Sequence, residues 1–111
     1  MKICITSQGA TLEALAEERF GRAPFFIIVD TDTGSFESLE NPFAGGSGGV
    51  GPKAAQLIIT HQVTALVSGM VGGNAREVLL AEGIQLYTYR AGGSVRDALD
   101  QFNKKTLERV E

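Results

Sequence analysis

The stretch Ala65-Leu66-Val67-Ser68-Gly69-Met70-Val71-Gly72-Gly73-Asn74 joins a short apolar run to a glycine-rich turn and leads into a segment with helical spacing. The apolar run 65–69 is typical of a buried strand, and the segment 74–82 predicts a helix that ends at Gly83, a residue type favoured after helix C-termini. A second apolar run, 84–88, predicts the next strand. Strand, helix and strand in this order predict two parallel strands joined by a right-handed crossover, and hence an α/β fold.

The rest of the chain adds three strands and two helices to this unit. Further apolar runs predict strands at 2–6, 25–30 and 35–40. Helical spacing predicts helices at 52–62 and 94–105. The turn formers Thr31-Asp32-Thr33-Gly34 predict a hairpin, Pro52 suits a first helical turn, and Ser94 with Asp97 can cap the last helix. The predicted order is therefore βββαβαβα.

The crossover rule places these strands in one five-stranded sheet with spatial order 3-2-1-4-5, in which only the second strand is antiparallel. The first two helices cover one face and the third covers the other, which makes three layers. We expect a single domain spanning residues 1–111. Open sheets of this kind bind ligands beyond the carboxyl ends of the parallel strands, where the strand order reverses. In this chain that place is the crevice between the first and fourth strands.

The same topology gathers most glycines of the chain at one edge of the sheet. The loops that share this edge are 7–9, 18–22, 44–51, 69–74 and 90–94. Glycine lets backbone amides approach a ligand closely, and amides beside helix N-termini form a cradle for anions. The loops predict a ligand-binding edge, with candidate glycines at Gly46, Gly48, Gly49, Gly92 and Gly93.

Arginines are concentrated near the same edge, although the chain as a whole is acidic, with a formal net charge of -3. Arg19 and Arg22 lie in one loop and are the favoured anion contacts, and Arg90 lies in another. Together with the helix N-termini they predict a local positive basin. The alternative is that several of these arginines are paired with neighbouring carboxylates such as Glu17 and Glu18.

Bulk composition excludes several classes of partner. The net charge of -3 and the pI near 5.1 argue against nucleic acid and anionic membranes, because phosphate binding relies on clustered Lys and Arg. No apolar run approaches the roughly 20 residues of a membrane span, and the N-terminus lacks the features of a signal peptide. We therefore expect a cytoplasmic protein. The single cysteine, Cys4, excludes an internal disulfide and a thiolate-rich metal cage.

Few residues of the chain have a pattern that is typical of catalysis. The run Gly45–Gly51 resembles a phosphate loop in composition but lacks its Gly-Lys-Ser or Gly-Lys-Thr ending. His61 is predicted at the opposite edge, and Cys4 lies mid-strand, where a cysteine usually behaves as a small buried hydrophobe. Met70 is a weak candidate metal ligand: its soft sulfur would suit Cu(I), but most methionines at such positions only pack. We expect a binding protein and not an enzyme.

Four motifs carry a resemblance to a known family. They are Glu18-Arg19-Phe20-Gly21-Arg22-Ala23-Pro24-Phe25-Phe26, Glu40-Asn41-Pro42 with its glycine loop, Gly69-Met70-Val71-Gly72-Gly73-Asn74-Ala75, and Gly83-Ile84. In these stretches the chain resembles the dinitrogenase iron-molybdenum cofactor biosynthesis family, and its short form is similar to the orange proteins of that family. The resemblance implies a ribonuclease H-like three-layer fold and non-covalent carriage of an anionic metal-sulfur cluster without catalysis.

The resemblance also implies where the cluster is held and which proteins exchange it. The matching positions are Arg19, Phe20, Gly21, Arg22, Met70, Val71, Gly72, Gly73 and Asn74. Because the chain has no well-placed thiolate, a molybdenum-copper sulfide cluster is favoured over the iron-molybdenum type. Cluster donor and acceptor proteins are the implied partners.

Two other functions use the same features of the sequence. The loop amides could bind phosphate or a nucleotide metabolite, either in a binding protein or in an enzyme. Alternatively the loops could meet a protein partner, with apolar anchors supplied by Phe20, Phe43 and Val71.

Overall fold

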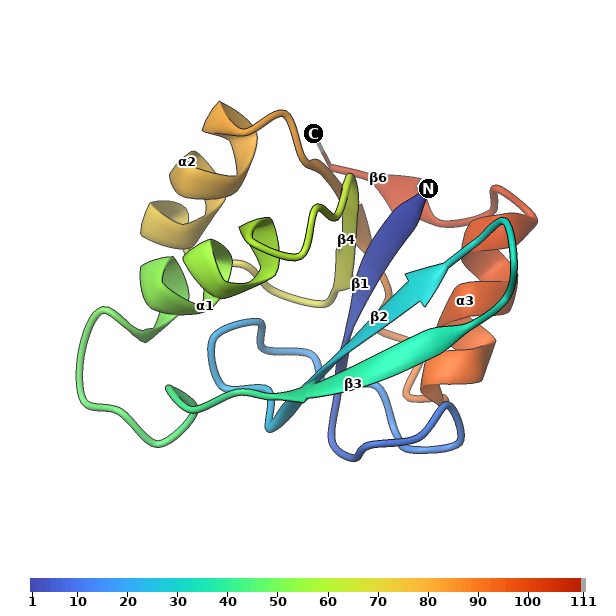
Figure 1. The fold of residues 1–111 in the computed structure, drawn as a ribbon, viewed down its shortest axis with the longest axis horizontal. Coiled ribbons are helices and arrows are strands. Elements are labelled where there is room, and N and C mark those ends of the chain that lie inside the picture. The colour runs from blue at the N-terminus through green and yellow to red at the C-terminus, as the bar shows by residue number, and fades with distance from the viewer. Residues whose placement is uncertain (111) are drawn as a thin grey trace.

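The computed structural model describes residues 1–110, which form a mixed sheet with helices on both sides (Figure 1). In chain order the elements are β1 (Lys2–Ser7), β2 (Phe25–Asp30), β3 (Phe36–Glu40), α1 (Val50–Ile59), β4 (Ala65–Ser68), α2 (Gly73–Ala81), β5 (Gln85–Thr88), α3 (Val95–Asn103) and β6 (Glu108–Arg109). The predicted order βββαβαβα is confirmed, and a short strand follows it. Within the described residues no helix is long and apolar enough to cross a membrane.

The sheet has the strand order β3-β2-β1-β4-β5-β6. β1 pairs in parallel with β4, and β4 pairs in parallel with β5, whereas β2 is antiparallel to both of its neighbours. The predicted order 3-2-1-4-5 is therefore confirmed, but the predicted number of strands is wrong. β6 pairs antiparallel with β5 through two residue pairs, Tyr87 with Arg109 and Thr88 with Glu108. A strand this short has no detectable alternation in sequence, and only the free edge of β5 defines it.

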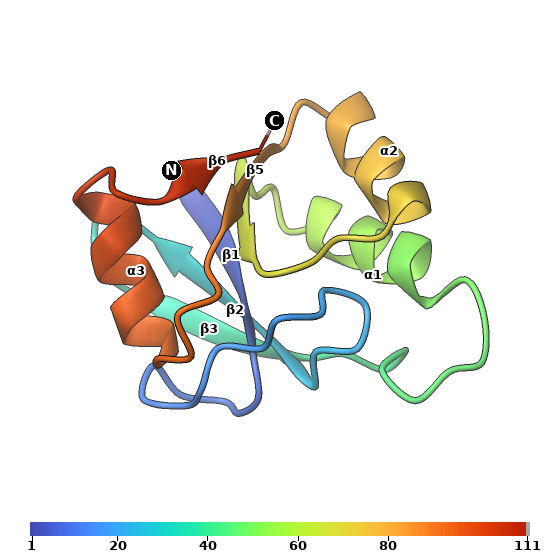
Figure 2. The same ribbon diagram turned by 180° about the vertical axis from the view of Figure 1, so that it is seen from behind.

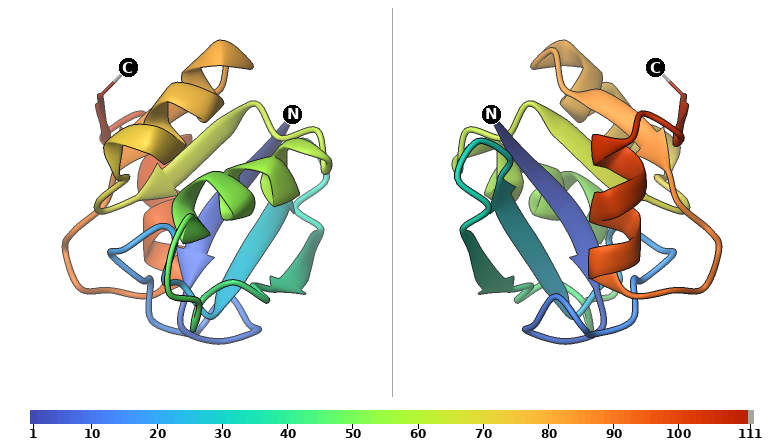
Figure 3. Two further views of the ribbon diagram at one scale, coloured as in Figure 1. Left: turned by 90° about the vertical axis from the view of Figure 1, so that its left-hand side faces the viewer. Right: turned by 90° about the vertical axis from the view of Figure 1, so that its right-hand side faces the viewer.

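Alternation along the central strands divides the apolar interior into two cores. On β1, Cys4 packs with residues of α1 and α2, whereas Ile3 and Ile5 pack with residues of α3. All three side chains are buried. Figures 1 and 2 show the sheet between α3 on one side and α1 and α2 on the other, and Figure 3 views it from each side, with α1 and α2 in front in the left panel and α3 in front in the right panel. A strand that is apolar on both faces requires cover on both, which is why the helices lie on either side of the sheet.

The helix ends follow the local signals of the sequence, with one exception. Ser94 and Asp97 form a reciprocal capping box on α3, and Gly83 follows α2 with φ of +75°, as predicted. α1 starts at Val50 rather than at Pro52. The preceding Gly49 adopts φ of +64°, a left-handed conformation that glycine tolerates, and this brings two further residues into the helix.

Candidate functional site

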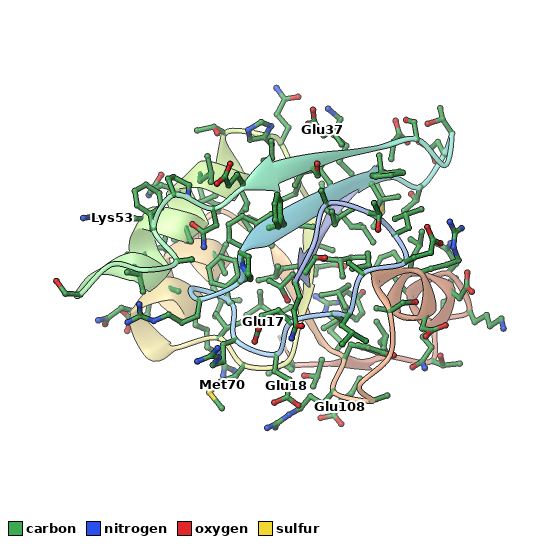
Figure 4. The ribbon with its side chains drawn as sticks, turned by 90° about the horizontal axis from the view of Figure 1, so that it is seen from below. Glu17, Glu18, Glu37, Lys53, Met70 and Glu108 are labelled. Carbon is green, nitrogen blue, oxygen red and sulfur yellow. The ribbon has the colours of Figure 1, made fainter. Side chains whose placement is uncertain are left out.

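The glycine loops meet at the lower edge of the sheet in Figure 1, where β1, β3, β4 and β5 end; Figure 4 views the molecule from this side. Backbone contacts join loops that are distant in sequence. Leu15 forms an isolated bridge with Ser94, Arg19 forms another with Met70, and the Phe20 N–H donates to the Met70 carbonyl at 2.9 Å. The expectation that the loops share one edge is confirmed. We call this edge the rim, comprising residues 7–22, 41–51, 69–75 and 90–94.

The crevice between β1 and β4 is covered by residues 17–20 of the rim. The Glu18 carbonyl accepts hydrogen bonds from the N–H groups of Gly69 and Met70, and the Thr6 hydroxyl donates to the Glu17 carbonyl at 2.6 Å. The chain's own backbone therefore lies over the crevice in which the sequence predicts a ligand. The accessible part of the rim lies farther along, beside α1 and α2.

A cleft of about 300 Å³ opens between the N-termini of α1 and α2, lined by Arg22, residues 48–52 and residues 72–75. We call it the twin-helix cleft. The two N-cap residues, Gly49 and Gly72, have no side chain with which to cap the helices. Within residues 1–110, no acceptor bonds the main-chain N–H groups of Val50, Gly51, Gly73, Asn74 and Ala75. Unpaired donors at two positive helix ends, with no carboxylate among the lining residues, make this cleft the candidate site for an anion.

Glycines of the rim differ in whether a β-carbon could be added to them: at some positions it would collide with neighbouring atoms, and at others it would meet open space. At Gly69 the added atom would lie 2.9 Å from the backbone of Glu18, so packing explains this glycine, and at Gly93 it would meet the ends of the Tyr89 and Asp97 side chains. At Gly48, Gly72 and Gly73 it would meet nothing within 4 Å, and φ is not positive at these positions. Neither packing nor backbone conformation requires glycine at these three positions. All three line the twin-helix cleft, where a side chain would separate the amides from a ligand.

The remaining predicted loop glycines either have a structural role or lie away from the twin-helix cleft. Gly46 approaches Val50, and Gly21 approaches the backbone of Gly51. Gly49 lines the cleft but has positive φ, as does Gly92, which lines a separate hollow with Arg19. These positions shape the rim through backbone geometry, and the structure gives no separate reason for ligand contact at them.

The predicted arginines have different surroundings, and the rim is not uniformly positive. Arg22 lines the twin-helix cleft, and its Nη1 donates to the carbonyls of Ala44 and Gly46 at 2.9 Å and 2.6 Å. Arg19 Nε lies 3.4 Å from a Glu17 carboxylate oxygen, and Arg90 Nε lies 3.9 Å from that of Glu18. The expected basin is thus restricted to the twin-helix cleft, since the paired alternative holds for Arg19 and Arg90.

Phe20, Met70 and Val71 occupy positions of different exposure. Phe20 is buried and stacks on Phe26 with ring centroids 5.4 Å apart, so its side chain belongs to the core. Met70 is exposed and lines, with Val71 and Arg90, a second cleft of about 450 Å³ between α2 and β6. Figure 4 shows the Met70 side chain pointing outward from the rim. Phe20 supports the rim from inside, whereas Met70 and Val71 remain accessible.

The structure adds site residues that the sequence interpretation did not single out. Val50, Gly51 and Ala75 line the twin-helix cleft, and each has an unpaired main-chain N–H. Because the helix was predicted to start at Pro52, the amides of Val50 and Gly51 were assigned to a flexible loop. The positive φ of Gly49 is the feature that moves them into the first turn. Lys53, by contrast, projects into solvent in Figure 4, with its Nζ 5.9 Å from the centre of the Phe43 ring.

Cys4 and His61 lie away from the twin-helix cleft. Cys4 is fully buried in the core beneath α1 and α2. His61 Nδ1 lies 3.5 Å from a Glu37 carboxylate oxygen, near the C-terminal end of α1. Within residues 1–110 there is no group of three or more His, Cys, Asp or Glu side chains that could hold a metal ion.

We expect Cys4 to resist alkylation in the folded protein. Burial raises the pKa of its thiol well above the ordinary value of about 8.5, so the reactive thiolate does not form at pH 8.5. Iodoacetamide should modify the chain in guanidinium chloride but not in buffer, as measured by mass spectrometry. Since the raised pKa belongs to the folded state, the Cys4 contribution to stability should be lost as pH rises above the unfolded pKa. Rapid alkylation of the native chain would show that the thiol is accessible.

The fold and the twin-helix cleft define a class: a small α/β protein with a cleft between two helix N-termini. A family model described as "Dinitrogenase iron-molybdenum cofactor" matches residues 1–105. The chain belongs to this family. An uncharacterized protein of Methanocaldococcus jannaschii is 32% identical over 95 residues, covering 83% of this chain and 80% of that protein.

Two solved structures show the same architecture. The apo form of the orange protein from Desulfovibrio gigas has a TM-score of 0.93 and 33% identity, covering 98% of this chain and 92% of that one. A putative NifB protein from Thermotoga has a TM-score of 0.87 and 38% identity, with the same two coverages of 98% and 92%. The similarity therefore extends over nearly the whole chain and agrees with the resemblance drawn from the motifs.

Proposed function

We propose that this chain is a non-catalytic carrier of an anionic metal-sulfur cluster, held in the twin-helix cleft. One observation carries the proposal: two helix N-termini present five unpaired main-chain N–H groups to one cleft whose lining includes no carboxylate. The N-termini favour negative charge, and the N–H groups are fixed donors. The family and its orange-protein member support a cluster as the anion.

The chemistry of a thiometallate cluster suits this donor set. Such a cluster supplies its own sulfide ligands and negative charge, so the protein needs hydrogen-bond donors and not thiolates. The Arg22 guanidinium lines the same cleft and has donors beyond the Nη1 group that binds the 44–46 carbonyls. The absence of a cysteine other than buried Cys4 favours a molybdenum-copper sulfide over the iron-molybdenum type. Binding of this kind is reversible, as transfer between donor and acceptor proteins requires.

Titration of the protein with tetrathiomolybdate and copper tests the proposal. We expect a new visible absorption band that the reagents alone do not give. In amide NMR spectra the largest shifts should fall on Val50, Gly51 and residues 73–75. An unchanged spectrum, or shifts that avoid the two helix N-termini, would contradict the proposal.

A phosphate ligand is the second candidate, because helix N-termini also bind phosphate groups. Its test is thermal unfolding with inorganic phosphate or ATP at constant ionic strength. A phosphate-binding protein would be stabilised by mass action as the ligand concentration passes its Kd. The cluster proposal predicts no stabilisation by these ligands beyond that of a chloride control.

A further inference from the structure

The two most exposed large apolar side chains in the described part of the chain both lie on the rim. Met70 is 55% exposed and Leu15 is 53% exposed. Single exposed apolar residues are common, but these two share the edge that contains the twin-helix cleft. The Met70 N–H donates to the carbonyl of Glu18, and Leu15 and Glu18 line the same hollow. Leu15 and Glu18 thus line one hollow, and Met70 adjoins Glu18 through the main chain.

The charges on this surface are of both signs. Glu18 and Arg90 lie 3.9 Å apart, and their side chains are 55% and 54% exposed. An exposed pair at this distance contributes little to stability, so either member can exchange its partner at little cost. A patch with one acid and one base side by side is complementary to itself after a two-fold rotation: Glu18 then faces Arg90 of the second copy, and Arg90 faces Glu18.

We propose that Leu15, Glu18, Met70 and Arg90 form an interface for a second copy of this chain, which we call the rim patch. The mixed charge is the reason for choosing a second copy, because a dedicated acidic or basic partner would be matched by a patch of one sign. The paired carboxylates and arginines become cross-subunit pairs, and the Leu15 and Met70 side chains leave water.

The cargo strengthens this association, a step that rests on the proposed function. The twin-helix cleft is open to solvent, and the loop 70–73 connects it directly to the rim patch. A second copy seated on the rim patch covers the cleft and excludes water from the outer side of a bound cluster. Electrostatic interactions of the anion with helix N-termini become stronger when water is excluded.

Sedimentation velocity over a range of concentrations, with and without tetrathiomolybdate and copper, tests the rim patch. We expect the apoprotein to move from the monomer mass of 11.8 kDa towards twice that mass as its concentration rises. Loading should shift the transition to lower concentration by about tenfold or more, which corresponds to about 1.4 kcal/mol. Monomers at every concentration in both states would overturn the proposal. Visible absorption of the same samples shows whether cargo is bound, so a failure of dimerisation is distinguishable from a failure of loading.

Charge exchange provides the matched variants. Leu15→Glu and Glu18→Arg should each weaken dimerisation by about tenfold or more. Glu18→Arg combined with Arg90→Glu restores self-complementarity and should recover the dimer. Leu15→Glu leaves the lining of the twin-helix cleft unaltered, so it should still bind cargo as a monomer, more weakly than the unmodified chain only by the contribution of the second copy. Dimers that are insensitive to both single substitutions would place the interface elsewhere and contradict the rim patch.

Discussion

Replacing Gly72 and Gly73 together with valine should weaken cluster binding by roughly a hundredfold or more and leave the fold intact. The side chains would stand over the unpaired amides at the start of α2 and keep an anion from reaching them. A hydrogen bond to a charged group is worth about 1.5–3 kcal/mol, so the loss of two weakens binding by roughly a hundredfold or more. Because a β-carbon at either position meets nothing within 4 Å, the free energy of unfolding should change by less than about 1 kcal/mol. Absorption titration and urea denaturation measure the two quantities.

Gly45→Val is the matched control for this double variant. Gly45 is also an exposed rim glycine with nothing within 4 Å of an added β-carbon, but it is not among the residues that line the twin-helix cleft. The Gly45→Val variant should therefore bind the cluster with the affinity of the unmodified protein. If the Gly72 and Gly73 variant binds as well as the control does, the cleft is not the cargo site.

Gly69→Ala should have the opposite effect, with a direct cost in stability. Its β-carbon would lie 2.9 Å from the backbone of Glu18, closer than real β-carbons approach. Glu18 cannot simply move away, because its carbonyl binds the N–H groups of Gly69 and Met70 over the end of β4. Overpacking of this kind costs about 1–3 kcal/mol. The urea midpoint should fall accordingly, with the slope unchanged.

Gly72→Ala is the control for this variant, since Gly72 lies three residues farther along the same loop. It shows whether the loop tolerates a side chain where no steric clash is expected. The alanine at Gly72 meets open space and should leave the urea midpoint within experimental error of the unmodified protein. Equal midpoints for the two alanine variants would mean that residues 17–20 are not held firmly over the crevice.

Much of the fold could be predicted because its signals are local. The apolar runs of β1, β2, β4 and β5 identify strands without reference to the rest of the chain, and the handedness of crossovers limits the order in which they pair. Gly83 and Ser94 mark helix ends by residue type alone. β6 was missed because two residues carry no periodicity, and the strand exists only through its pairing with β5.

The candidate site was predicted in outline but not in detail. Loop composition and topology correctly indicated one glycine-rich edge, yet they could not show that residues 17–20 cover the crevice between β1 and β4. Nor could they show which arginine faces the cleft. Arg19, Arg22 and Arg90 are alike in sequence, and only their surroundings distinguish them: two lie beside carboxylates and one beside backbone carbonyls.

The amino-acid sequence by itself determined the elements of this protein except β6, the order of the first five strands and the edge at which the glycine loops gather. These depend on periodicity, turn chemistry and chain connectivity, all of which act over short stretches or follow from chirality. Only the tertiary structure decided that the open amides belong to α1 and α2. A backbone N–H is paired only where an acceptor lies within hydrogen-bonding distance: the Glu18 carbonyl binds those of Gly69 and Met70, and no described acceptor binds those of Gly51 and Gly73.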